Sequence, residues 1–149
     1  MQFTTSQVHA ILNLPTQTMR YWRAVLEPLK NKPSGKIARF TVGEILALAV
    51  VSKLVTGMRI DVGAIAPLST DLFELCRRPA FFVHTTLLCV NIAEAKASLI
   101  DDLQSTFTKT PLILLPIGEM AKELTKLLSE SDESDFEQRE FSWPLTSVR

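Results

Sequence analysis

The chain has 149 residues, of which 46% are hydrophobic and 21% charged, as is ordinary for a globular protein. No apolar run approaches the roughly 18 residues of a membrane span, and the first residues lack the layout of a signal peptide. We therefore expect a cytoplasmic protein that does not enter a membrane.

Cys76 and Cys89 lie among apolar residues and are expected to be buried thiols. We expect no metal site, since His9 and His84 lack ligand spacing. We also expect no cofactor, and no Gly-rich phosphate loop supports a nucleotide.

The net charge of zero conceals a division along the chain. Residues 1–66 carry eight basic and three acidic side chains, whereas residues 67–149 carry eight basic and thirteen acidic ones. The excess is greatest between Arg20 and Arg39, where six basic residues accompany one acidic residue. Such a segment suits a polyanion, although by charge alone a solvated basic face explains it equally well.

The chain begins with the signals of a short helix. Thr4 can cap this helix, and Gln7 stands at the reciprocal position of a capping box. Phe3 and Val8 have the spacing of a hydrophobic staple, and the helix should end near Asn13.

A second helix is predicted to begin at Pro15 and to end at Pro28. Its apolar face comprises Met19, Trp22 and Leu26. Its other side comprises Thr16, Gln17, Arg20 and Arg23. Two short helices joined by about three residues form a helix-turn-helix unit.

Residues 29–40 are predicted to form a hairpin with lysines near its tip, because Pro33, Ser34 and Gly35 indicate a turn. Such a hairpin would be a wing. Phe40 and Thr41 then repeat the first helix-start signature, which predicts a third helix over residues 42–56. This helix is apolar nearly all round and should be buried. A short helix over residues 61–66 follows.

The second half is predicted to contain a helix over residues 68–78, strands over 80–92 and 111–117, and helices over 93–107 and 119–128. This order suggests a β-α-β unit with parallel strands. The expected fold class is α+β: a winged helix-turn-helix (residues 1–67), a small β-α-β-α dimerisation segment (68–128) and an acidic tail (129–149). The end of the tail, which contains Phe141 and Trp143, is either disordered or a docking motif for a protein partner.

The N-terminal part resembles the MerR-type winged-helix family over about 65 residues. Three stretches carry the resemblance: FTTSQVHAILNLPTQTMRYW, GKIARFTVGEI and SKLVTGMRIDVGAI. Within the first, Thr18 to Trp22 match the family's T-[LI]-R-Y-[YW] pattern in its recognition helix. Two features depart from the family: the wing lacks the common Gly-Tyr-Arg, and the long dimerising coiled-coil helix is replaced by a β-containing segment.

The resemblance implies that the second helix lies in the major groove of double-stranded DNA. Thr16, Gln17, Arg20 and Arg23 would then face bases or phosphates. Tyr21 fits either a contact with the DNA backbone or core packing, whereas Trp22 is expected in the core. The wing would place basic side chains against flanking phosphates, namely Lys32, Lys36 and Arg39.

The sequence therefore predicts a sequence-specific transcriptional regulator that acts as a homodimer, since paired half-sites raise affinity. One alternative is an excisionase-like architectural DNA-binding protein. Another is a regulator whose C-terminal half senses a small molecule or a protein partner. An enzyme is not expected, because no nucleophile–base constellation is present in the sequence.

Overall fold

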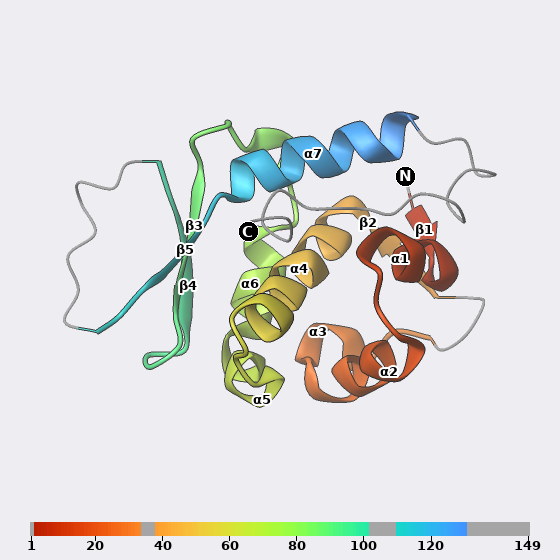
Figure 1. Cartoon of the computed structure of the whole chain (residues 1–149), viewed down its shortest axis with the longest axis horizontal. Helices are drawn as coiled ribbons and strands as arrows, with labels where there is room; N and C mark the ends of the chain where they lie inside the picture. The colour runs from red at the N-terminus through yellow and green to blue at the C-terminus, as the bar shows by residue number, and fades with distance from the viewer. Residues whose placement is uncertain (1, 34–37, 102–109, 131–149) are drawn as a thin grey trace.

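The computed structural model describes residues 2–33, 38–101 and 110–130 of the chain (Figure 1). These residues form a mixture of helices and two small antiparallel sheets, which confirms the expected α+β class. The elements up to the middle of the chain are β1 (Gln2–Thr4), α1 (Thr5–Leu12), α2 (Thr16–Val25), α3 (Glu27–Lys30), β2 (Arg39–Thr41) and α4 (Val42–Ser52). A π-helical turn (Lys53–Gly57), α5 (Val62–Ile65), a 3₁₀ turn (Ala66–Leu68) and α6 (Ser69–Leu75) follow. The remainder comprises a 3₁₀ turn (Pro79–Phe81), β3 (Leu87–Asn91), β4 (Lys96–Ile100), β5 (Ile113–Leu115) and α7 (Ile117–Glu130).

Both predicted capping boxes are present. The Gln7 amide N–H donates to the Thr4 hydroxyl at 3.3 Å, and the Thr4 N–H donates to Gln7 Oε1 at 2.8 Å. Thr41 and Glu44 repeat this arrangement at the start of α4, with both distances at 3.2 Å. Each box satisfies helix-start donors that would otherwise lack partners, so the sequence fixes where α1 and α4 begin.

Strands β1 and β2 pair in antiparallel register, with Phe3 opposite Phe40. Both aromatic side chains are buried. Each strand leads directly into a capped helix, so this two-stranded ribbon joins the starts of α1 and α4. The ribbon thus holds together two helices whose first residues are 37 positions apart in the chain, from Thr5 to Val42.

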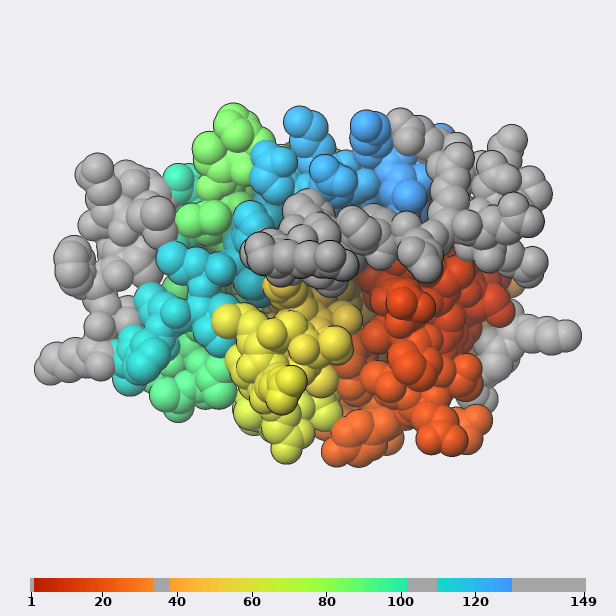
Figure 2. All heavy atoms as spheres, in the orientation of Figure 1, coloured from red at the N-terminus to blue at the C-terminus, as the bar shows by residue number. Residues whose placement is uncertain are grey.

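Helix α4 is the centre of the molecule, as its apolar sequence predicts. Every residue from Ile45 to Val51 is buried, and the helix contacts α1, α6 and α7. The buried apolar side chains of the described residues form one cluster that extends from Phe3 to Leu128. Figures 1 and 2 show the N-terminal helices and the three-stranded sheet on opposite sides of the segment containing α4. Residues on both sides of position 67 therefore share a single core.

The predicted hairpin over residues 29–40 is wrong in the described part of that segment. Its first arm is the helix α3, which has Pro28 in its first turn and buries Leu29. Its second arm, β2, pairs with β1 instead. Proline favours a first helical turn because its fixed φ suits the helix and its missing N–H is not needed there. The predicted tip, residues 34–37, lies outside the described residues.

The predicted β-α-β unit is also wrong. Residues 96–100, expected within a helix, form β4, and both β4 and β5 pair antiparallel to β3 in the order β4-β3-β5. The physical reason is a period of two: Lys96 and Ser98 are exposed, whereas Ala97 and Leu99 pack on the core. The turn that precedes β4 needs a left-handed residue, and Ala95 adopts φ 53° there.

Helix α7 agrees with the prediction for residues 119–128. Met120, Leu124 and Leu128 are buried, and Leu127 packs against the same cluster. Cys76 and Cys89 are free, buried thiols, as predicted. Among the helices described, none combines the length and the hydropathy of a membrane span.

Candidate nucleic-acid interface

Helix α2 separates an apolar side from a polar one. Met19 and Trp22 are buried, which confirms the prediction that Trp22 belongs to the core. On the opposite side Thr16, Gln17, Arg20 and Tyr21 are exposed. Tyr21 is 56% exposed, which excludes core packing for this side chain. Positions i, i+1, i+4 and i+5 lie on one helix face, so these four side chains form a continuous surface.

The turn between α1 and α2 is fixed by hydrogen bonds and by a buried side chain. Asn13 has the left-handed conformation (φ 51°), and Leu14 is buried. His9 forms two hydrogen bonds with Leu14 across the turn. Its carbonyl oxygen accepts from the Leu14 N–H at 3.2 Å, and its Nδ1 lies 2.8 Å from the Leu14 carbonyl oxygen. Since a carbonyl oxygen can only accept, Nδ1 is the donor in this hydrogen bond. The orientation of α2 relative to α1 is therefore set locally.

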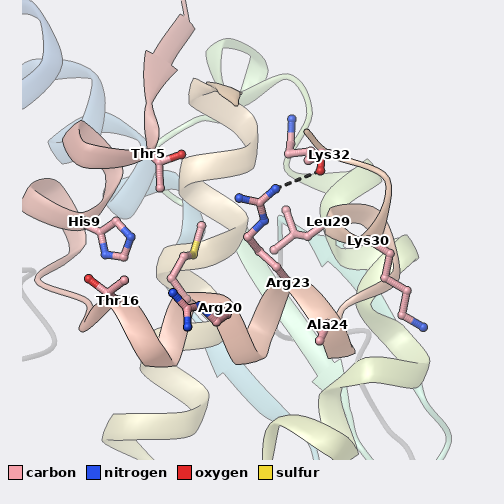
Figure 3. A pocket seen from close by; sticks show the side chains of 10 residues that line it. Thr5, His9, Thr16, Arg20, Arg23, Ala24, Leu29, Lys30 and Lys32 are labelled. Atoms are coloured by element: carbon pink, nitrogen blue, oxygen red, sulfur yellow. Dashed lines mark hydrogen bonds between the residues drawn. The ribbon is translucent and has the colours of Figure 1, made fainter. Parts of the chain in front are cut away.

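A hollow of about 460 Å³ lies beside the polar face of α2 (Figure 3). Its lining comes from α1, α2 and the segment around α3. The lining residues are Thr5, His9, Thr16, Met19, Arg20, Arg23, Ala24, Leu29, Lys30 and Lys32. Four of these ten are arginines or lysines, and none of the described residues that line the hollow is acidic. Lys30 and Lys32 are paired with acids outside the lining, so, among the described residues, the uncompensated positive charge that would attract anionic groups is that of Arg20 and Arg23.

Arg23 and Lys32, both predicted to contact DNA, bind distant parts of the protein instead. Arg23 Nη2 donates to the carbonyl oxygen of Lys32 at 2.9 Å (Figure 3). The same nitrogen also donates to the carbonyl oxygen of Pro33. The Lys32 ammonium lies 2.7 Å from Glu44 Oε2 and donates to the Arg39 carbonyl oxygen at 2.8 Å. The same Nζ lies 5.0 Å from the centre of the Phe40 ring.

The other predicted residues have different surroundings. Arg20 and Arg39 are exposed, and Arg39 Nη1 donates to the Ala38 carbonyl oxygen at 2.9 Å. Lys36 lies outside the described residues. The prediction omitted Lys30, which lines the hollow and forms an exposed ion pair with Glu27 at 2.8 Å. Its place in the dense basic segment after Arg20 was the only sequence signal that could have identified it.

Thr5 and His9 also line the hollow and were not predicted, because their part in it depends on how α1 packs beside α2. Within the described ranges, no group of three or more His, Cys, Asp or Glu side chains could hold a metal ion.

Comparisons with protein-family models, with curated proteins and with solved structures found no match for this chain.

Proposed function

We propose that this protein binds double-stranded DNA in a sequence-specific manner, as a transcriptional regulator, through a helix-turn-helix built on α1 and α2. The observation that carries the proposal is the exposed polar face of α2 beside a hollow lined by four basic side chains and no described acidic one. An α-helix fits the major groove, and a basic surface next to it suits the phosphates that flank the groove.

The side chains on α2 have distinct parts in this proposal. Gln17 and Arg20 are exposed and have the hydrogen-bonding groups that read adenine and guanine, respectively. Thr16 and Tyr21 flank them and suit contacts with the sugar-phosphate backbone. Basic groups on the neighbouring segment would contact phosphates; of these, Lys30 and Arg39 are exposed.

A homodimer is part of the proposal, because a single helix-turn-helix buries a small interface on DNA. In the described sheet β4 and β5 are the outer strands, so each has an edge that no described strand pairs with. Pairing of two such edges across a twofold axis would enlarge a small sheet. Light scattering of the full chain tests this part directly: a monomer at binding concentrations would refute the dimer and leave DNA binding open.

The main test is selection of duplexes from a random-sequence library by the full chain. The proposal expects a defined motif, and Arg20→Ala should weaken binding to that motif by about tenfold or more while affinity for unrelated duplexes changes far less. Arg78→Ala is a matched control, because Arg78 is exposed but precedes the turn Pro79–Phe81, away from α2 in the sequence. Failure of the full chain to bind any duplex at low salt would refute the proposal.

Two alternatives would give different results in related experiments. An excisionase-like protein would be recovered at recombination sites instead of promoters in a genome-wide DNA pull-down.

A sensing role for the C-terminal half has one observation in its favour. A second hollow of about 540 Å³ lies between residues 79–84 and α7, and its lining includes His84, Lys122 and Lys126. A change of DNA affinity on addition of an anionic metabolite, and its loss in Lys122→Ala, would support that role.

A further inference from the structure

Lys32 joins the two ends of the segment that follows α3. Its Nζ donates to the carbonyl oxygen of Arg39, seven residues further along the chain, at 2.8 Å. The Glu44 carboxylate, which belongs to α4, fixes the same ammonium group. The two side chains are 19% and 25% exposed, so this ion pair is less screened by water than a surface pair. The buried Phe40 ring lies beneath the ammonium and restricts its position further.

Arg23 joins the same segment to the recognition helix. From the third turn of α2, one guanidinium nitrogen donates to two successive carbonyl oxygens, those of Lys32 and Pro33. Figure 3 shows this side chain extending from α2 toward Lys32. Hydrogen bonds from a charged donor are stronger than those between neutral groups, and the planar guanidinium fixes direction as well as distance.

We propose that Arg23, Lys32 and Glu44 form a clamp that holds the backbone of Lys32, Pro33 and Arg39 in place relative to α2 and α4, and that DNA binding requires this clamp. The inference rests on the proposed function and changes two of its assignments. Arg23 and Lys32 are positioning residues, and the phosphates are contacted by other basic groups. Glu44, although negatively charged, is required for binding to a polyanion.

The direction in which one substitution changes DNA affinity distinguishes a clamp from a pair of phosphate contacts. Glu44→Gln retains an amide oxygen for the capping box, as Gln7 does at the start of α1, but removes the charge that holds Lys32. If Lys32 contacts phosphate, this change removes a repelling acid and frees a lysine, so DNA affinity should rise. If the clamp operates, affinity should fall by about tenfold or more, the scale expected for loss of one charge-assisted hydrogen bond.

Glu27→Gln is the matched control. Glu27 lies in the same basic segment and also pairs with a lysine, but that pair is exposed and takes no part in the clamp. Its neutralisation should raise DNA affinity slightly, by about twofold or less, because only a repelling charge is lost. We therefore expect DNA affinity to fall in Glu44→Gln and to rise slightly in Glu27→Gln. Both are measured on the same duplex at the same salt concentration.

A second measurement is made on the free protein and does not depend on DNA. Backbone amide exchange over residues 38–41 should be faster in Glu44→Gln than in the unsubstituted chain, and unchanged in Glu27→Gln. A rise in DNA affinity in both variants, or unchanged exchange in Glu44→Gln, would overturn the clamp. If the unsubstituted chain binds no duplex, the proposed function fails, and the clamp's role in DNA binding fails with it. If both variants bind more tightly than the unsubstituted chain, only the clamp fails.

Discussion

Replacement of Gly43 by alanine tests how closely the two halves of the chain pack. A Cβ atom at position 43 would lie 2.5 Å from the carbonyl oxygen of Cys76, 2.9 Å from the Cα of Arg77 and 2.9 Å from the carbonyl oxygen of Arg77. All three are backbone atoms, so none can move aside by a change of rotamer. Overpacking of this kind costs roughly 1–3 kcal/mol, while the better helix propensity of alanine returns up to about 1 kcal/mol.

Gly43→Ala should therefore lower the free energy of unfolding by about 2 kcal/mol, measured by urea denaturation followed by circular dichroism. Gly57→Ala is the control, because the nearest atom to its Cβ is Cδ of the flexible Lys53 side chain at 3.2 Å. This control should change stability by less than about 1 kcal/mol. A Gly43→Ala protein as stable as the unsubstituted chain would refute the close packing of α4 on residues 76–77, and with it the shared core.

Three further predictions concern stability. Thr4→Ala and Thr41→Ala should each lower the free energy of unfolding by about 1 kcal/mol in urea, because each removes a capping box. Gly118→Ala should cost more than Gly57→Ala in the same assay, since its Cβ would lie 1.9 Å from the Val83 carbonyl oxygen. Burial raises the pKa of the Cys76 thiol from 9.0 to about 12. The thiol of the unfolded chain therefore ionises first, and stability should fall above about pH 9, by at most about 1.4 kcal/mol per pH unit. Urea denaturation at pH 8 and pH 10 measures this decline, which Cys76→Ala should reduce.

The elements that could be predicted are those whose signals are local. The capping boxes depend on residues three positions apart, and the apolar face of α2 depends on helical spacing, so both are contained in short stretches of sequence. Strand β4 could not be predicted in this way. Its preceding turn has Ala95, instead of glycine or asparagine, in the left-handed conformation, so the usual hairpin signal is missing.

In the candidate interface, too, only the features that depend on local sequence could be predicted. Exposure of Gln17 and Arg20 follows from their places on an amphipathic helix. The bonds of Arg23 and Lys32 do not, because they depend on partners seven to twelve residues away in the chain. These partners are Lys32 and Pro33 for Arg23, and Arg39 and Glu44 for Lys32. Composition identifies a basic segment, but only the tertiary structure shows which of its cations are bound within the protein.

The ribbon formed by β1 and β2 has an approximate local twofold symmetry. The axis passes through the Phe3–Phe40 pair, and on each strand the phenylalanine precedes a threonine that caps a helix. Two copies of the Phe-Thr motif thus lie antiparallel to each other. The first leads into α1 at the surface, and the second leads into the buried helix α4. The motif therefore determines only where a helix starts; the residues after the cap determine whether solvent or protein surrounds it.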